Sequence, residues 1–419
     1  DGNNSILYPS GSLSFIASNF FDVLSNDSSI VDYLKIRLGY GSSAGFPSPY
    51  STRNTLSLNG RAFIDPNGGL ISSNTTSNRL GNPNLLPELI SEFEIGVDTR
   101  LFSNKVGINL SYFRKETKDL ITTKELDPST GYTFTTINGG DMEVQGVELD
   151  LDLRWVNTLD GFSWNSGINF YADESLVTRL PEGIDQIIIG SYSSADAKNA
   201  AIVGQPFNVL IGDQIRRSDS GDKVINKATG NYIIDPDDVV IGDPNPDFIA
   251  NLDNNFSYKN FTLDIGIGYR HGGDIFSKTA VTLLSRGIID FPFDRLGTYV
   301  LQGVNVDGQP NTTQIGATDI AFSNWLGGDE LEIWDGTTIR LREISLGYQF
   351  TGELLNKIPF KTLSLNLSGS NLWYKAVNFP DGVNFDTNTL SNGVSNNLGI
   401  EYFAGPSSKR YGFTVKASF

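Results

Sequence analysis

The 419-residue sequence contains no cysteine and only one histidine. The absence of cysteine excludes disulfides, cysteine-ligated zinc sites and thiol chemistry. The single histidine, His271, excludes a histidine-rich metal site and gives no support for a Ser-His-Asp triad. No phosphate-cradling loop that ends in Gly-Lys-Ser or Gly-Lys-Thr is present. Paired carboxylates are common, but they repeat along the expected strands and do not converge as in a glycosidase. We therefore expect no enzymatic activity.

Long hydrophobic runs are also missing. No segment reaches the roughly 18 apolar residues that a spanning helix needs, and hydrophobic residues make up 39% of the chain. A transmembrane β-barrel needs no such run, because only every second residue of a strand faces lipid. The chain has 48 acidic and 31 basic residues, and its net charge is −17. This acidity argues against nucleic-acid partners, which bind basic patches.

The strongest positive signal is alternation with period two. In residues 147–155, Val147, Leu149 and Leu151 alternate with acidic residues, and Trp155 ends the apolar row. Alternation of this kind predicts strands with one apolar and one polar face. The same pattern runs through residues 33–40, 91–101, 105–115, 162–171, 248–258, 261–270, 337–350, 362–370 and 411–419.

The alternation changes phase in two of these strands. Met142 and Val144 are even-numbered, whereas the apolar row from Val147 onward is odd-numbered, with Gly146 between them. In the segment 337–350 the apolar row changes from odd to even positions after Leu341. A β-bulge at each place would restore the facing, so two bulges are predicted.

The connections between these strands alternate in length. Long connections of about 41–88, 116–140, 172–246, 272–336 and 375–408 alternate with the short ones Phe102–Lys105, Asn157–Gly161, Lys259–Asn260 and Thr351–Lys361. Tight periplasmic turns and large extracellular loops are typical of outer-membrane barrels, whereas soluble β-sandwiches rarely place all long loops on one side. If the C-terminus is periplasmic and every short turn lies on the same side, the segment 172–246 must contain an even number of wall strands, either none or two. The candidates for two such strands are residues 205–216 and 223–234. We expect an all-β antiparallel transmembrane barrel with about 11–14 strands in this chain.

Several motifs occur in order along nearly the whole chain. They are DYLKIRLGYG at 32–41, GNPNLLPE at 81–88, YFRKETKDLI at 112–121, NGG at 138–140, QGVEL at 145–149, VIGDPNP at 240–246 and RLREISLGY at 340–348. Together they resemble the C-terminal portion of SusC/RagA-type TonB-dependent outer-membrane receptors.

The resemblance implies a barrel of about 22 strands that encloses an N-terminal plug. It also implies a SusD-like surface lipoprotein as a lid, and TonB-driven import of oligosaccharides or peptides. The sequence shows no recognisable plug or TonB box, so residues 1–419 are expected to be the C-terminal part of such a barrel. The plug and the first strands would then be absent from this chain, and TonB would act through that missing part. The expected setting is the Gram-negative outer membrane, in contact with its lipid, with long loops outside.

Two other functions stay open. The chain could form a structural or adhesion barrel of the outer membrane that acts through its surface loops. It could also be a soluble carbohydrate-binding or hydrolytic β-protein. A TonB box and plug upstream of Asp1 favour the receptor, and extraction without detergent favours the soluble protein.

Charged residues on the polar faces are candidates for the lumen wall. They could contact a plug or line a substrate path, and the alternative for each is a solvated wall residue with modest ion pairs. The predicted lumen-facing residues are Glu92, Glu94, Asp98, Arg100, Glu148, Asp150, Asp152, Arg154, Asp264 and Arg270.

The chain ends on an alternating strand with a terminal aromatic residue. Tyr411, Phe413, Val415 and Phe419 fit the C-terminal signal that barrel-assembly machinery reads. The alternative is an ordinary last strand whose phenylalanine belongs to an aromatic girdle, and the two interpretations are compatible.

Loop aromatics are candidates for ligand or lid contacts. Trp325 and Trp334 lie in the connection 272–336, and Tyr192 lies in the connection 172–246. Such residues could stack on sugar rings or dock a lid protein, and the alternative is packing of each loop on itself.

An acidic turn is the one cation candidate. Asp235, Asp237 and Asp238 could supply oxygen ligands to a structural Ca²⁺ in an extracellular loop. The glycine and terminal glutamate of an EF-hand loop are absent, which favours a solvated acidic turn. No other cofactor is expected.

Overall fold

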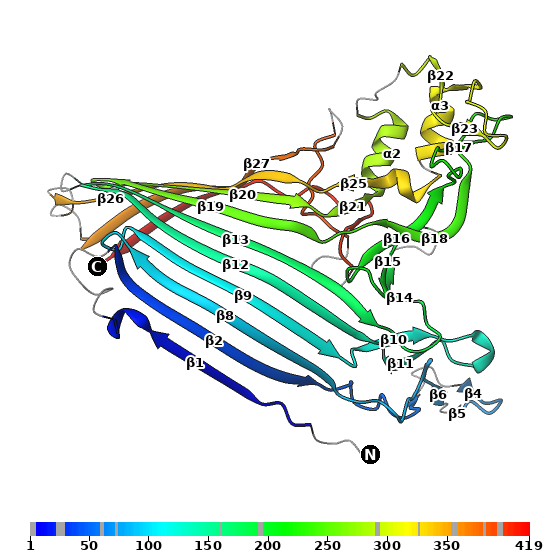
Figure 1. The fold of residues 1–419 in the computed structure, drawn as a ribbon, viewed down its shortest axis with the longest axis horizontal. Helices are drawn as coiled ribbons and strands as arrows, with labels where there is room; N and C mark the ends of the chain where they lie inside the picture. The colour runs from blue at the N-terminus through cyan, green and yellow to red at the C-terminus, as the bar shows by residue number, and fades with distance from the viewer. Residues whose placement is uncertain are drawn as a thin grey trace.

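The structure is a computed structural model, and it describes residues 6–21, 30–58, 63–71, 74–158, 161–191, 196–289, 294–325, 327–352, 355, 359–379, 383–391 and 397–419. Its dominant feature is a curved antiparallel sheet of 11 strands, here called the wall (Figure 1). Each wall strand pairs with the next one along the chain, so the sheet is an up-and-down meander. The strands are β1 (Ser10–Ile16), β2 (Val31–Gly45), β8 (Glu88–Leu101), β9 (Val106–Lys118), β12 (Asp141–Asn157), β13 (Phe162–Arg179), β19 (Pro246–Tyr258), β20 (Phe261–Gly272), β26 (Thr338–Phe350), β27 (Thr362–Ala376) and β29 (Arg410–Ser418).

The antiparallel pairing of the wall strands confirms the prediction of an all-β antiparallel barrel wall. The count of 11 lies within the predicted range. Strand β1 was not among the predicted strands, because only Leu13 and Phe15 alternate with small residues in its short run. None of the helices in the described ranges is long and apolar enough to cross a membrane.

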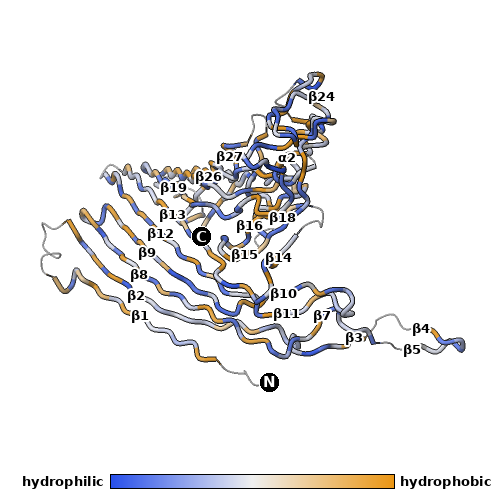
Figure 2. The backbone as a smooth tube through the Cα atoms, turned by 45° about the vertical axis from the view of Figure 1, so that its right-hand side comes forward, coloured by the Kyte–Doolittle hydropathy of each residue, from blue (hydrophilic) through white to orange (hydrophobic). Residues whose placement is uncertain are grey.

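One face of the wall is apolar and exposed. Residues such as Leu38, Phe93, Leu367 and Phe413 keep 38–65% of their side-chain surface open. The buried hydrophobic residues of the described chain lie at strand ends and in the loops, not in the middle of wall strands. Figure 2 shows hydrophobic and hydrophilic residues mixed along the wall strands. An exposed apolar face of this extent fits lipid and not water.

Aromatic rings gather at both ends of the apolar face. At the end with the short turns they are Trp155, Trp164, Phe256, Phe261, Tyr348 and Phe350, with neighbouring centroids 4.6–5.5 Å apart. At the other end they are Phe170, Phe248, Tyr269 and His271. The rise of about 3.3 Å per residue puts Phe261 and Tyr269 about 26 Å apart along β20, close to the height of a barrel's lipid-facing band.

Only one of the two predicted bulges exists. Pairing of β20 with β26 passes from Gly266–Glu343 to Ile267–Leu341, so Arg342 is the bulged residue. The bulge predicted at Gly146 is wrong, because β12 pairs with β9 and β13 without interruption through Gly146. Met142 therefore lies on the polar face, where it lines a pocket together with Ile187 and Phe207 of the loop body. Tertiary packing, not a bulge, explains the change of phase.

The segment 172–246 adds no strands to the wall, because β13 pairs directly with β19. Of the two predicted alternatives, none or two wall strands, the structure has none, and the candidate segments 205–216 and 223–234 are not wall strands. Residues 209–215 instead form a strand of a separate four-stranded sheet outside the wall. The side chains of Val209, Leu210 and Ile211 are all buried, so this strand packs on both faces and could not alternate.

The three long connections between β13 and β19, β20 and β26, and β27 and β29 pack together at one end of the wall. We call them the loop body (Figure 1). It contains β14 (Gln186–Ser191), β15 (Lys198–Ile202), β16 (Val209–Ile215), β17 (Val224–Ile225), β18 (Ile234–Gly242), β21 (Asp274–Ser277), α2 (Lys278–Arg286), β22 (Thr298–Val300), β23 (Val304–Asn305), β24 (Gln314–Gly316), α3 (Ala317–Asp319), the π-helix η3 (Ile320–Trp325), the 3-10 helix η4 (Asp329–Glu332), β25 (Ile333–Asp335) and β28 (Ile400–Glu401).

The loop body has its own core and its own cross-links. Leu210, Phe276 and Ile400 come from three different connections and form one buried cluster. Strand β28 pairs in parallel with β21, and the buried carboxylate of Glu401 accepts hydrogen bonds from Ser277 Oγ at 2.8 Å and Thr279 N at 3.2 Å. This carboxylate caps the N-terminus of α2, where unpaired backbone N–H groups favour negative charge.

The two remaining long connections join β2 to β8 and β9 to β12. Residues 119–140 form a hairpin of β10 (Ile121–Glu125) and β11 (Phe134–Asn138), and β11 also pairs with β7 (Arg79–Leu80). The other short elements are η1 (Ala17–Asn19), β3 (Leu56–Leu58), β4 (Phe63–Ile64), β5 (Leu70–Ile71), β6 (Asn74–Thr76) and η2 (Pro128–Thr130).

Candidate functional site

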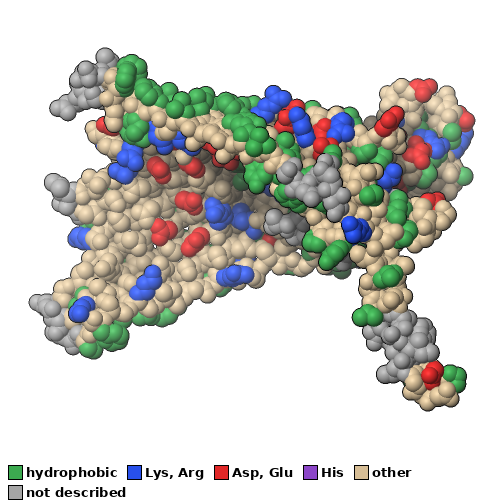
Figure 3. Space-filling view, turned by 90° about the horizontal axis from the view of Figure 1, so that it is seen from below, with side chains coloured by type: hydrophobic (Ala, Val, Ile, Leu, Met, Phe, Trp, Pro, Cys, Tyr) green, Lys and Arg blue, Asp and Glu red, His purple; other side chains and the backbone are tan. Residues whose placement is uncertain are grey.

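The charged residues singled out from the sequence share the polar face of the wall. Asp98 lies opposite Asn109, which lies opposite Asp150. Directly opposed residues project to the same face, so the rows 92–100 and 148–154 lie together. Asp264 and Arg270 join the same face through their partners on β19. Figure 3 shows this face as a hollow that holds acidic and basic side chains together.

Arg37 is the centre of a polar network on this face. Its guanidinium donates to Glu94 and Asp98 at 3.1 Å each, and to Ser111 at 3.1 Å. Lys35 pairs with Asp98 at 3.0 Å. A Cβ on Gly96 would lie 2.7 Å from the Arg37 guanidinium, so the glycine makes room for it. These partly exposed ion pairs tie three strands together at modest energy.

Lys35 and Arg37 were not among the predicted lumen residues. The signal was present, because both alternate with Leu34, Ile36 and Leu38 in the segment 33–40. The polar face therefore carries more basic residues than the two predicted acidic rows suggested.

A groove of about 440 Å³ lies further along the same face, over β12, β13, β19, β20 and β26. Asp152, Asp253, Asp264 and Glu343 line it, together with Arg154. The carboxylate of Asp264 accepts hydrogen bonds from Asn255 at 2.6 Å and Ser345 at 3.0 Å. The remaining lining is glycine, serine and asparagine with Leu153 and Ile265, so carboxylates and amides make up most of the groove.

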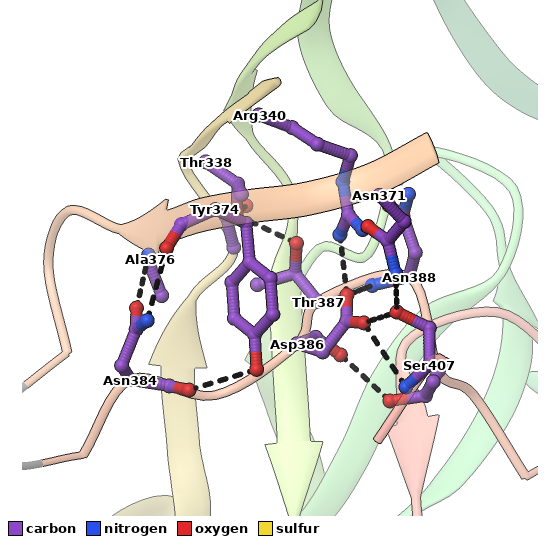
Figure 4. A network of polar contacts seen from close by, with 12 residues as sticks. Thr338, Arg340, Asn371, Tyr374, Ala376, Asn384, Asp386, Thr387, Asn388 and Ser407 are labelled. Carbon is purple, nitrogen blue, oxygen red and sulfur yellow. Dashed lines mark hydrogen bonds and ion pairs between the residues drawn. The ribbon is translucent and has the colours of Figure 1, made fainter. Parts of the chain in front are cut away.

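The last long connection is fastened to the polar face by a buried network (Figure 4). Arg340 of β26 donates to Asp386, which also accepts from the Ser407 hydroxyl. Thr338 and Thr387 share a hydrogen bond of 2.6 Å. Asp386 and Thr387 are 2% and 0% exposed, so no water replaces these contacts.

A second buried network joins two connections of the loop body. Lys278 Nζ contacts Asp196 at 2.9 Å and Glu332 at 2.7 Å. Asp213 and Asp329 each accept a hydrogen bond from the other's backbone N–H, at 2.6 and 3.3 Å. Burial raises the pKa of Asp329 to about 7 and that of Glu332 to about 8, since one lysine does not balance these carboxylates.

Of the three predicted loop aromatics, the structure describes the side chain of Trp334. Trp334 packs on Phe379 with ring centroids 5.3 Å apart and belongs to the core around α2. It therefore follows the packing alternative and not the ligand-contact prediction. Tyr192 lies outside the described residues. Trp325 ends the π-helix, and its side chain also lies outside what the structure describes.

The predicted calcium ligands are not brought together. Asp235 pairs with Arg216 at 2.5 Å, and Asp238 pairs with Lys198 at 2.8 Å. Asp237 is exposed. Within the described ranges, no group of three or more His, Asp or Glu side chains could hold a metal ion.

Strand β29 ends at the edge of the wall that carries the short turns, and Phe419 follows it there. Tyr411, Phe413 and Val415 project from the apolar face, opposite Gly369, Leu367 and Leu365. Phe419 contacts Phe360 of the turn before β27, with centroids 5.0 Å apart. All described long connections are at the other end, which agrees with the predicted arrangement of turns and loops.

The chain is similar to receptors of one family. Residues 1–372 match the family model described as "TonB dependent receptor-like, beta-barrel". The chain is 26% identical over 452 aligned residues to TonB-dependent receptor P3 of Formosa agariphila, with 100% of this chain and 42% of that protein covered. Structures of the RagAB peptide importer in its closed-closed and open-open states superpose with TM-scores of 0.71 and 0.70 at 17% identity. They cover 100% of this chain and 44% and 43% of theirs, so the chain spans less than half the length of these relatives.

Proposed function

The chain belongs to the TonB-dependent receptor β-barrel family, and we propose that it forms part of the wall, interior and outer loops of an outer-membrane import receptor. The observation that supports this function best is the division of the wall into two faces. One face is exposed and apolar between two aromatic belts, and the other is a charged hollow. Such a wall separates lipid from a hydrated path. Receptors of this family transport and do not catalyse, and we assign no reaction to the chain.

The proposed orientation places the short turns and Phe419 in the periplasm and the loop body outside the cell. It is supported by the clustering of the long connections at one end of the wall. Residues 1–419 would be the C-terminal part of the barrel, completed by further strands and a plug that this chain does not contain. TonB would act on that missing part.

The proposed cargo is a polar solute, either an oligosaccharide or a peptide. The polar face favours both, since it offers carboxylates, amides and guanidinium groups along its length. We also propose a SusD-like lipoprotein as the lid over the loop body. The RagAB structures, which share the fold, come from a peptide importer.

The test is uptake by cells that carry the whole receptor gene. Deletion of the receptor gene or of tonB should abolish growth on the same complex nutrient, and complementation should restore it. The protein should partition with the outer membrane and require detergent for extraction. Nutrient uptake unchanged by deletion of tonB, with surface adhesion lost, would favour the adhesion barrel instead.

A further inference from the structure

A cavity of about 250 Å³ lies in the loop body, where the end of α2 meets α3 and η3 (Figure 1). Its lining comes from the connection between β20 and β26 and includes two arginines, Arg286 and Arg295. None of the described residues that line it is acidic. Two guanidinium groups thus share one cavity in a chain whose net charge is −17. The cavity exceeds the roughly 150 Å³ that holds a benzene molecule in a protein core, so it has room for a small organic anion.

Arg286 is held at this cavity by the end of α2 and by an aromatic ring. It is the last residue of the helix, where a positive charge is favourable, and Gly287 with a φ of 74° ends the helix after it. The guanidinium of Arg286 lies over the ring of Phe322 of η3, with Cζ 5.4 Å from the ring centroid. A stacked guanidinium keeps its N–H groups in its own plane, so its edge stays available to a hydrogen-bond acceptor.

Arg295 lies against the backbone that follows Arg286. A Cβ on Gly287 would overlap the guanidinium of Arg295, so only glycine at this position lets that group lie here. A guanidinium has five N–H donors, and contacts within the loop leave donors for a ligand. Thr318 of α3 also lines the cavity, and its hydroxyl adds a further donor.

The neighbouring acidic residues do not line the cavity. The carboxylate of Asp294 accepts a hydrogen bond from the backbone N–H of Leu296 at 3.0 Å. The carboxylate of Asp319 lies beside Gly316, 3.6 Å from where a Cβ of that glycine would be. Asp290 lies outside the described residues. The described lining is therefore cationic, and a cleft lined by charge of one sign concentrates ions of the other sign.

We propose that this cavity, here called the arginine pocket (Arg286, Arg295 and Thr318), binds a phosphate monoester as its dianion. Phosphate oxygens accept paired hydrogen bonds from guanidinium groups, and two arginines balance the two negative charges. A carboxylate has one charge and would leave one arginine uncompensated. A free phosphate ester and a phosphorylated lipid of the outer leaflet present the same group. The pocket belongs to the loop body and not to the hollow, so the inference does not depend on the proposed cargo.

The experiment is a calorimetric titration of the whole receptor, purified in detergent at low salt without phosphate, with methyl phosphate, sulfate and acetate. We expect methyl phosphate and sulfate to compete for one site and acetate to bind at least about tenfold more weakly. Arg286→Ala and Arg295→Ala should each weaken methyl phosphate binding about tenfold, since each removes hydrogen bonds to a charged group. Arg216→Ala, which removes a loop-body arginine paired with Asp235, is the matched control.

The pH dependence of binding is a second readout. The second proton of a phosphate monoester leaves with a pKa of about 6, and arginine stays charged throughout this range. Methyl phosphate binding should therefore weaken several-fold between about pH 7.5 and about pH 5.5. Sulfate remains a dianion, so its binding should not change. An equal loss for both anions would contradict selection of the dianion.

Lipid A in the same detergent distinguishes the two sources of phosphate. Displacement of methyl phosphate by lipid A assigns the pocket to membrane phosphate, and lack of displacement assigns it to a free ester; both results support the pocket. No binding of methyl phosphate, binding that both arginine substitutions leave unchanged, or equally tight binding of acetate overturns it. Heat-modifiable migration in gels shows that each variant forms a folded barrel.

Discussion

Arg340 and Asp386 form an ion pair between the wall and the last long connection, 46 residues apart in the chain. The two residues are 9% and 2% exposed. Burial alone would raise the pKa of Asp386, but the hydrogen bonds from Arg340, Ser407 and the backbone of Asn388 hold this pKa below its ordinary value. The charged pair thus fastens a connection of the loop body to the mouth of the hollow.

Removal of one partner of this pair should loosen that connection. In Asp386→Ala the guanidinium of Arg340 stays buried without its carboxylate, which typically costs about 3–5 kcal/mol. We expect hydrogen exchange in residues 383–391 to accelerate accordingly, as measured by mass spectrometry on the purified receptor. Arg114→Ala breaks an exposed ion pair with Glu143 and is the control. It should change the opening free energy obtained from hydrogen exchange by less than about 1 kcal/mol. Equal effects of the two substitutions would show that the buried pair does not hold the connection.

The joint between β16 and η4 should weaken as the pH rises. The pKa values of Asp329 and Glu332 are raised to about 7 and about 8, so their protonated forms are the stable ones in the folded loop body. Between about pH 4 and pH 8 the folded state binds more protons at these carboxyls than the unfolded state does. The free energy of unfolding therefore decreases as the pH rises through this range. Hydrogen exchange of residues 209–215, corrected for intrinsic rates, should be slower at pH 5 than at pH 9. Glu332→Gln should reduce this pH dependence, and an unchanged profile in that variant would contradict the assignment.

Arginine on the two faces of β27 should have opposite consequences. Leu367→Arg places a charge on the apolar face and should cost about 2–4 kcal/mol if it lies near the membrane midplane. Ser368→Arg places the same charge in the hydrated hollow and should change stability little. The measurement is the midpoint of urea unfolding in phospholipid vesicles. Similar losses in both variants would mean that the apolar face does not meet lipid.

Phe419 should matter for assembly more than for packing. If the terminal ring is part of an assembly signal, Phe419→Ala should lower the amount of folded receptor in the outer membrane several-fold. Phe360→Ala removes the ring that packs against Phe419, at 5.0 Å between centroids, but leaves the signal intact. Outer-membrane levels of the two variants, compared by heat-modifiable migration, distinguish the roles. A loss of the same size in both would assign Phe419 to packing alone.

The wall could be predicted from sequence because each strand faces two different surroundings. Lipid on one side and water on the other impose alternation, as in β12 and β20, and a true bulge at Arg342 leaves a visible change of phase. The change of phase at Gly146 was misread as a bulge, because Met142 lies on the polar face and lines a pocket with Ile187 and Phe207 of the loop body. No local pattern in the sequence contains these two distant residues.

The loop body could not be predicted in the same way. Strand β16 is buried on both faces, so it shows an apolar run without alternation and became a candidate wall strand. Lys278 and Glu332 lie 54 residues apart in one connection and Asp196 lies in another, and nothing in their sequence spacing indicates that they meet.

The parallel pairing of β21 with β28 has a consequence for how this protein can change in evolution. Ser277 and Glu401 are 124 residues apart and belong to different connections. Ser277 begins α2, and the carboxylate of Glu401 accepts a hydrogen bond from the first turn of that helix. A shortened or exchanged connection would leave Glu401 or the α2 N-terminus buried without its partner. A change in one of these two connections should therefore require a compensating change in the other.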